Sequence, residues 1–262
     1  GLGNSNDNYY QELYPYVGVS AYWYCYEEGY TNMSQCPNYG QYDNGQDVFN
    51  YYWNFNGTSL PPDFGNYSGG GSYAINNGVV LSIPSSFYYV GIYYNNTINT
   101  NQIVETYQSG YISNQFPPSY DGGLFLQNVT PGSPTVEIAS GVTNGVLFEA
   151  MPHKCSGGIF AIRVVNNGHA DLNFCPLYNL IYPPIIISGN WISSDYVYYY
   201  INYELLAEGS ISSSNVSYSP LSYVGLSLGS GGGQSTTFTL SFSWLRVRAY
   251  PPNGVMPEIY IS

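Results

Sequence analysis

Charged side chains, and basic ones above all, are scarce in this sequence. Only 8% of its 262 residues are charged, and four Lys and Arg stand against sixteen Asp and Glu, which gives a formal net charge of -12 at pH 7. Proteins that bind nucleic acid neutralise phosphates with clustered Lys and Arg. The composition therefore argues against a nucleic-acid partner.

Long apolar runs are also missing. The clusters "YPPIII" and "YVYYYINY" are too short to cross a bilayer, so we expect no membrane span. The chain begins at Gly1 rather than Met, and no apolar run follows a basic stretch. We therefore expect a mature protein that is extracellular or at the cell surface, secreted after removal of a signal peptide.

The sequence has no Cys-x-x-Cys pair, which argues against a zinc ribbon or a redox motif. Its four cysteines are Cys25, Cys36, Cys155 and Cys175. Three pairings are open, and we favour Cys25 with Cys36 and Cys155 with Cys175 because each closes a short, turn-rich loop. Disulfides fit an oxidising compartment.

Histidine is nearly absent too. His153 and His169 are the only two, and they lie near Cys155 and Cys175, the residue types of a mixed metal site. Their spacing matches no zinc motif, and the cysteines are better assigned to disulfides. We therefore expect no metal and no cofactor.

Uncharged polar groups take the place of charge. Asn, Ser and Gly are frequent and there are 32 tyrosines, whose phenols ionise only near pH 10. Such a surface predicts tolerance of acid. Asn-x-Ser/Thr sequons make six asparagines candidates for N-glycosylation: Asn32, Asn56, Asn66, Asn95, Asn128 and Asn215.

Alternation of apolar and polar residues recurs from end to end, without a convincing helical period. Strands are predicted over 78–83, 88–95, 102–109, 123–129, 135–139, 145–151, 158–166, 184–188, 195–209 as a hairpin, 222–229 and 237–250. This spacing predicts an all-β, two-sheet β-sandwich of the jelly-roll type. Residues 42–262 form the predicted sandwich, and residues 1–41 a separate tail with a disulfide loop.

The tail holds an alternating segment from Leu13 to Cys25. One interpretation is an ordinary first strand of the sandwich, broken at Pro15. The other is a strand donated to a neighbouring subunit, whose sheet edge it would extend. The inward face of that donor strand would be Leu13, Val17, Val19, Ala21 and Trp23.

Carboxylates in a catalytic arrangement are not found. Jelly-roll glycosidases place them on one strand as Glu-x-Asp-x-x-Glu, and no such string occurs. Glu27 and Glu28 are adjacent and would face opposite ways, and Glu204 and Glu208 belong to the predicted hairpin. We therefore predict that the chain is not an enzyme.

Two weaker signals concern ligands. The stretch "YDGG" (120–123) could lend oxygen ligands to calcium, although such clusters are more often plain turns. Exposed tyrosines and Trp191 could stack on sugar rings, although most aromatics in strands belong to a core.

Several stretches carry a resemblance to a known family. "FNGTSL" with its Gly-rich turn, "YYYINYELLAEG" and "FSWLRVRAYPPNGVMP" resemble concanavalin-A-like, laminin-G-like jelly rolls of archaeal secreted proteins, including those with the domain of unknown function 2341. In that family the hairpin turn reads Ile-Asn-Gly, whereas Tyr203 stands here. In composition the chain is similar to subunits of archaeal extracellular threads, in which a tail strand completes the next subunit.

These patterns predict a structural subunit of an extracellular filament or adhesin, whose partners are copies of itself. The alternative is a secreted, lectin-like module that binds glycans. A glycoside hydrolase is the weaker alternative, because the fold hosts all three kinds of protein.

Overall fold

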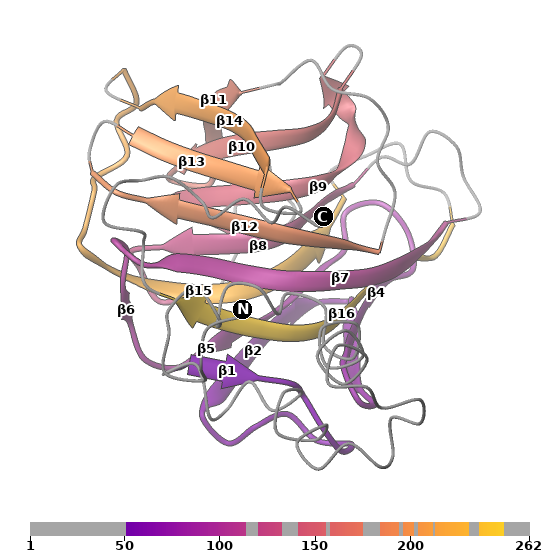
Figure 1. Ribbon diagram of the computed structural model, residues 1–262. Coiled ribbons are helices and arrows are strands. Elements are labelled where there is room, and N and C mark those ends of the chain that lie inside the picture. The colour runs from indigo at the N-terminus through magenta and orange to yellow at the C-terminus, as the bar shows by residue number, and fades with distance from the viewer. Residues whose placement is uncertain are drawn as a thin grey trace, which may run out of the picture. The chain divides into compact units, whose positions relative to one another are not determined.

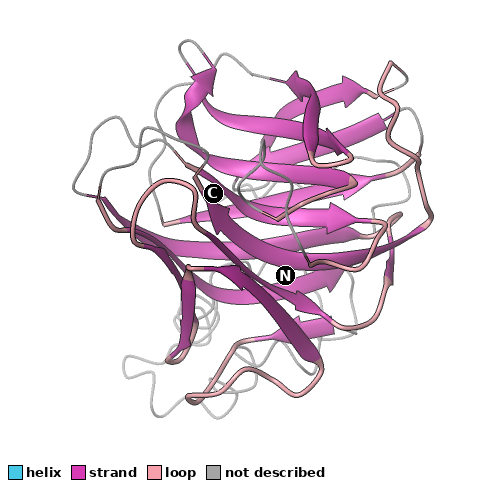
Figure 2. Cartoon of the chain, turned by 180° about the vertical axis from the view of Figure 1, so that it is seen from behind, coloured by secondary structure: helices cyan, strands magenta, loops and turns pink. Residues whose placement is uncertain are grey.

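The computed structural model describes residues 51–113, 120–132, 141–155, 158–174, 184–193, 196–201, 204–211, 213–230 and 236–248. Every regular element in these ranges is a strand (Figure 2). The chain divides into two compact units, Trp53–Tyr250 and Gly1–Tyr52 with Pro251–Ser262. The short strand β1 (Tyr51–Trp53) spans the boundary, and all other strands belong to the first unit.

Two antiparallel sheets make up this unit (Figure 1). Sheet A runs in the order β14 (Glu204–Ser210), β13 (Tyr196–Ile201), β12 (Ile185–Trp191), β7 (Ile103–Ser113), β16 (Phe238–Arg248), β4 (Val79–Ile83) and β3 (Ser72–Ile75). Sheet B runs in the order β11 (His169–Phe174), β10 (Gly158–Asn166), β9 (Gly145–Cys155), β8 (Asp121–Gln127), β15 (Leu221–Gly229), β5 (Tyr89–Tyr94) and β2 (Phe64–Gly69). The short β6 (Ile98–Asn99) pairs with the start of β15. The predicted all-β, two-sheet sandwich is confirmed.

The last two strands that the structure describes, β15 and β16, lie in the interior of the sheets and not at their edges. β16 lies between β7 and β4 in sheet A, and β15 lies between β8 and β5 in sheet B. Both are antiparallel to each of their neighbours. The fold therefore places residues from both ends of the unit side by side, including those of the site below.

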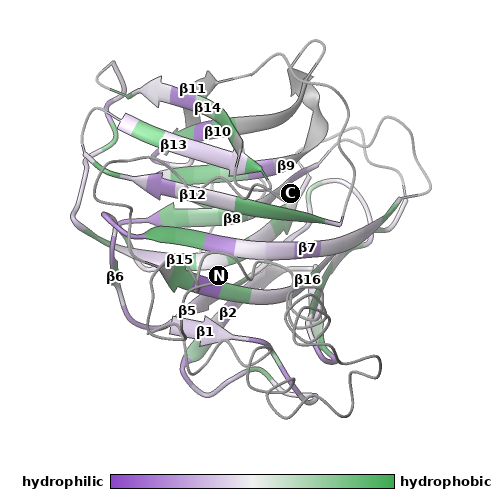
Figure 3. Cartoon of the chain, in the orientation of Figure 1, coloured by the Kyte–Doolittle hydropathy of each residue, from purple (hydrophilic) through white to green (hydrophobic). Residues whose placement is uncertain are grey.

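The core lies between the two sheets and is made by alternate residues of each strand. A Cβ on Gly189 of β12 would strike the ring of Phe148 in β9, so these two strands meet across the core. Apolar segments in β8 and β12 stand out in Figure 3. Both strands are buried along their whole length, including the polar residues Asp121 and Gln127 of β8 and Ser188 and Asn190 of β12.

The strand predictions are confirmed for all ranges except 135–139, which lies outside the described residues. The hairpin over 195–209 is present, with Ile201 opposite Glu204. Sequence patterns missed β1, β2, β3, β6 and β11. The turn predicted at 120–123 is wrong: Tyr120 is buried and β8 begins at Asp121. Among the described residues, no helix is long and apolar enough to cross a membrane.

Candidate functional site

The outer face of sheet B, away from sheet A, can be followed from residue to residue. A Cβ on Gly122 would lie 2.8 Å from Leu240 of sheet A, so Gly122 faces the core. Because side chains alternate, Phe125 faces outward. Phe125 pairs with Gly225 of β15, and Gly225 pairs with Tyr93 of β5. Tyr93 therefore lies on the outer face.

Three successive outward pairs between β2 and β5 each join one glycine to one tyrosine. The pairs are Gly65 with Tyr93, Tyr67 with Gly91, and Gly69 with Tyr89. The tyrosine changes strand at each step. We call Tyr67, Tyr89 and Tyr93, with their three glycine partners, the tyrosine ladder.

Each tyrosine ring of the ladder lies across its glycine partner. A Cβ on Gly65 would be 2.5 Å from Cζ of Tyr93, and one on Gly91 would be 2.6 Å from Cε1 of Tyr67. A Cβ on Gly69 would likewise strike the ring of Tyr89. Real Cβ atoms do not approach other atoms so closely. The glycines therefore let the rings cover the sheet backbone.

The rings form a row across the edge of sheet B. Tyr67 lies between Tyr89 and Tyr93, with ring centroids 6.4 Å and 6.3 Å apart and planes tilted by 35° and 32°. Tyr223 of β15 adds a fourth ring, 6.2 Å from Tyr93 and edge-on to it at 86°. Tyr89, Tyr93 and Tyr223 are half-buried, so parts of their rings reach solvent.

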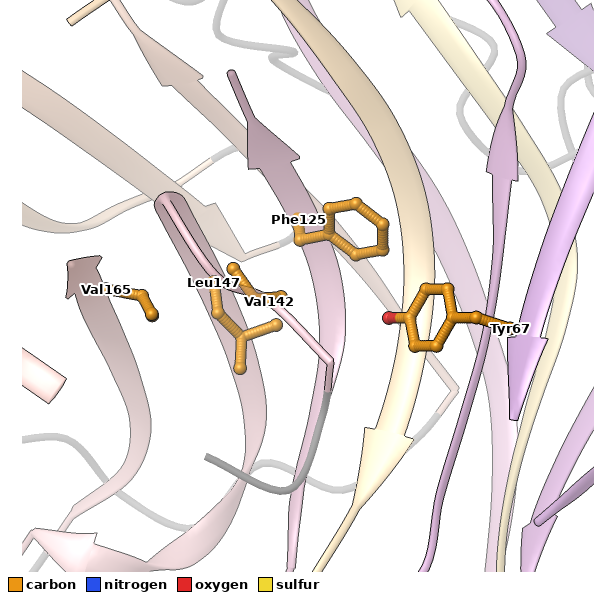
Figure 4. Close-up of a cluster of buried hydrophobic side chains, with 5 residues drawn as sticks. All are labelled: Tyr67, Phe125, Val142, Leu147 and Val165. Carbon is orange, nitrogen blue, oxygen red and sulfur yellow. The ribbon is translucent and has the colours of Figure 1, made fainter. Parts of the chain in front are cut away.

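The middle of the row is fixed from below. Tyr67 is only 7% exposed and belongs to a buried cluster with Phe125, Val142, Leu147 and Val165, against which Tyr89 and Tyr93 also pack. Figure 4 shows the phenol end of Tyr67 directed toward Phe125 and Val142. This packing holds the central ring, and through it the orientation of the outer two.

Burial raises the pKa of Tyr67 far above that of a phenol in water, with a smaller opposing contribution from the Ser227 hydroxyl. The phenolates of Tyr89 and Tyr93 would add to this rise by repulsion. At neutral pH the Tyr67 phenol is therefore uncharged. The ladder and Tyr223 include no Asp, Glu, Lys, Arg or His.

An ion cluster lies on the same sheet, on strands β8, β9 and β10. Arg163 places Nη1 3.2 Å from Asp121 Oδ1 and Nε 3.3 Å from Glu149 Oε1. Glu149 pairs with Gly123, so it faces outward like Phe125. All three charged residues are buried. Buried charges persist only when paired, and here one guanidinium serves two carboxylates.

A second buried ion pair lies in the middle of sheet A. Arg246 Nε donates to Glu105 Oε2 at 2.7 Å, and Ser188 Oγ donates to Oε1 of the same carboxylate at 3.0 Å. The guanidinium carbon of Arg246 lies 4.5 Å from the centroid of the Trp244 ring. These contacts join β7, β12 and β16.

No family model and no curated protein matches the chain. Solved structures with a similar fold include the Crh5 transglycosylase, with a TM-score of 0.52, 11% identity, 77% of this chain and 85% of that chain covered. A legume lectin-like domain from Entamoeba histolytica matches with a TM-score of 0.51 and 9% identity, and the match covers 71% of this chain and 90% of that chain. A glycoside hydrolase family 16 endo-glucanase from Bacteroides ovatus matches with a TM-score of 0.50 and 11% identity, and the match covers 75% of this chain and 99% of that chain.

This chain has a lectin-like jelly-roll fold. At these identities the likeness shows the fold alone. Membership of the archaeal secreted family with the domain of unknown function 2341 stays a prediction, as does any relation to archaeal threads, because no family model matches.

The prediction that the chain is not an enzyme is wrong. Its fold is shared with a transglycosylase and with a family 16 endo-glucanase. The prediction rested on the missing Glu-x-Asp-x-x-Glu string, which tests for carboxylates on a single strand. The fold instead brings Asp121 and Glu149 together from two strands, around Arg163.

Many predicted site residues lie outside the described part of the chain. These are the donor-strand residues Leu13, Val17, Val19, Ala21 and Trp23, the cysteines Cys25, Cys36 and Cys175, and Asn32. The side chains of His153 and Cys155 are not described either. The strand donation and both disulfides therefore stay predictions.

The remaining predicted residues are scattered over the unit. Four sequon asparagines are exposed: Asn56, Asn66, Asn95 and Asn215. The half-buried Asn128 donates its amide to the Ser217 carbonyl oxygen. Trp191 is fully buried and packs edge-on to Tyr218, so the sugar-stacking role considered for it is wrong. His169 is exposed, and the described residues hold no group of three or more metal-ligating side chains.

Sequence reasoning missed both features that define the site. The ladder has a signal, because Gly-x-Tyr-x-Gly at 65–69 is complementary to Tyr-x-Gly-x-Tyr at 89–93 when the strands are antiparallel. The ion cluster also has one: Glu149 and Arg163 each interrupt an apolar strand, and a charge in such a place needs a partner.

Proposed function

We propose that this protein binds a glycan on the outer face of sheet B, over the tyrosine ladder and Tyr223. The observation that carries the proposal is the ladder itself: the rings of Tyr89 and Tyr93 are half-buried and lie across glycines, and the buried Tyr67 between them belongs to a buried cluster that fixes the row. The half-buried rings therefore offer aromatic surface on either side of Tyr67, from Tyr89 on one side and from Tyr93 and Tyr223 on the other. Sugar rings are flat enough to stack on it.

The chemistry of tyrosine suits such a ligand. Its ring offers an apolar surface and its hydroxyl a hydrogen-bonding end, at a low cost in side-chain entropy. The ladder carries no cation that could pair with an acidic sugar, and Arg163 on the same sheet is held by two carboxylates. The ligand class is therefore an uncharged glycan.

The comparisons support this proposal through the fold. Similar structures include a legume lectin-like domain and the Crh5 transglycosylase in complex with NAG, the latter with a TM-score of 0.52. The family 16 endo-glucanase was solved in complex with G4G3G-2F-DNP. We take these two sugars, as N-acetylglucosamine and glucan oligosaccharides, as the first probes.

Tyr93→Ala tests the proposal by calorimetry with those oligosaccharides. Loss of one stacking ring should weaken binding about two- to tenfold. The matched control is Tyr196→Ala, since Tyr196 is 49% exposed on β13 of sheet A. An equal loss of affinity in both variants would contradict a site on the ladder. Unchanged affinity in Tyr93→Ala would contradict it as well.

A second candidate is cleavage of the bound glycan. The specific observation is the pair Asp121 and Glu149, on the same sheet as the ladder and sharing Arg163. Glycosidases work with two carboxylates. Oligosaccharides incubated with the protein and separated by size test this candidate. Products that form with the unsubstituted protein and vanish with Glu149→Gln, while the circular dichroism of the variant stays that of the folded protein, would support it.

Assembly into a filament by donation of residues 13–25 is a separate proposal, which rests on the alternating pattern of that segment. Deletion of residues 1–24 should abolish multimers seen by light scattering or electron microscopy. Multimers that survive the deletion would overturn it. Glycan binding on the ladder does not depend on the outcome.

A further inference from the structure

Beyond one end of the tyrosine ladder, the connection from β4 to β5 ends in two exposed aromatic residues. Phe87 is 70% exposed, the highest value among the large hydrophobic side chains of the described residues, and Tyr88 is 37% exposed. The segment 84–88 reads Pro-Ser-Ser-Phe-Tyr and carries no charge. We call Phe87 and Tyr88 the aromatic tip.

Phe87 is held in a strained backbone conformation. Its φ is 66°, in the left-handed region that bulky side chains avoid. Such strain persists only where the surroundings fix it, and it gathers at functional positions. Here the Phe87 amide donates to the Ser230 carbonyl at 2.6 Å, and the Ser230 amide donates back to the Tyr88 carbonyl at 3.1 Å.

The aromatic tip directly precedes Tyr89, the ladder tyrosine at the start of β5. A Cβ on Gly70 would strike the ring of Tyr88, just as a Cβ on Gly69 would strike the ring of Tyr89. Gly70 has a φ of 80°, so glycine is required there for its backbone as well as for space. A Gly-Tyr contact therefore recurs one residue past the end of β2, at the aromatic tip, where the Tyr88 ring lies at the rim of the sheet beside the ladder.

We infer that the aromatic tip is an outer subsite for long, uncharged glycans, reached only by chains that extend beyond the ladder. This inference rests on the proposed function. It specifies that the ligand is longer than the ladder. It also specifies that the exposed ring of Phe87 contacts the far end of that ligand. A role in the hydrophobic core does not account for Phe87, because its ring is exposed and its φ is strained.

The experiment measures affinity against ligand length, using the whole chain and gluco-oligosaccharides from disaccharide to octasaccharide. Phe87→Ala should weaken binding of the longest chains about two- to tenfold and leave the shortest unchanged. Leu205→Ala is the matched control, because Leu205 is 49% exposed on β14 of sheet A. It should change neither affinity.

Phe87→Gly separates binding from folding. Glycine accepts the positive φ, so this variant should keep or raise the melting temperature while losing the same affinity for long chains. Unchanged long-chain affinity in both Phe87 variants, with weakened binding in Tyr93→Ala, overturns the inference alone. Absence of any binding by the unsubstituted protein overturns the proposed function, and the inference with it.

Discussion

Three tyrosines in the sandwich have phenols that burial keeps in the neutral form. Desolvation raises the pKa of Tyr67, Tyr120 and Tyr199 well above its ordinary value of about 10. In the unfolded chain these phenols ionise near pH 10, whereas in the folded chain they keep their protons. Their contribution to stability is therefore complete below about pH 10 and is lost as the pH rises further.

The free energy of unfolding should fall above about pH 10 by about 1.4 kcal/mol per pH unit for each such phenol. Denaturant titrations between about pH 8 and about pH 11 measure this slope. Tyr67→Phe should flatten it by one phenol's share. A stability that stays constant across this range would contradict the assignment.

Single residues also show where sequence reasoning reaches its limit. Glu149 and Arg163 each stand out in an apolar strand, which signals a buried partner but does not identify it. The register of β8, β9 and β10 decides that Arg163 serves Asp121 as well. Pairing of that kind depends on strand order, which local patterns do not carry.

At the scale of elements, the contact between β2 and β5 depends on its glycines. Gly91→Ala places a Cβ within 2.6 Å of the Tyr67 ring, which cannot retreat because it packs in the buried cluster. We expect a loss of about 1–3 kcal/mol in the free energy of unfolding. Glycan binding should weaken with it. Denaturant unfolding and calorimetry give the two readouts.

The control for this prediction is another glycine within a strand. A Cβ on Gly110 of β7 meets no atom within 4 Å, so Gly110→Ala should be neutral or stabilise by up to about 1 kcal/mol. Equal destabilisation by both alanine substitutions would contradict the prediction that Gly91 is needed for the close packing of the Tyr67 ring.

The same glycines explain which strands the sequence predicts. Strands with alternating Val, Ile, Leu and Phe, such as β4, β15 and β16, are visible from their pattern. β2 reads Phe-Gly-Asn-Tyr-Ser-Gly, a composition typical of turns, and its pairing with the tyrosines of β5 makes it a strand. The element that carries the candidate site is thus the one that local propensity hides, because cross-strand packing decides its structure.

At the scale of the whole molecule, basic side chains are few, and two of the four hold strands together. Arg163 and Arg246 are each 1% exposed, and their ion pairs join three strands of sheet B and at least two of sheet A. Removal of one partner of a buried pair typically costs about 3–5 kcal/mol. Both arginines therefore belong to the framework of the sandwich.

Their position has a consequence for digestion. A protease that cuts after Lys or Arg must draw the peptide bond into its own cleft, which a buried strand with a neighbour on both sides does not allow without unfolding. Brief trypsin treatment of the folded protein should leave the bonds after Arg163 and Arg246 intact, and mass spectrometry should find both cleaved once the protein is denatured. A native fragment ending at Arg163 would contradict this. Apart from those two bonds, the chain offers such a protease only Lys154 and Arg248.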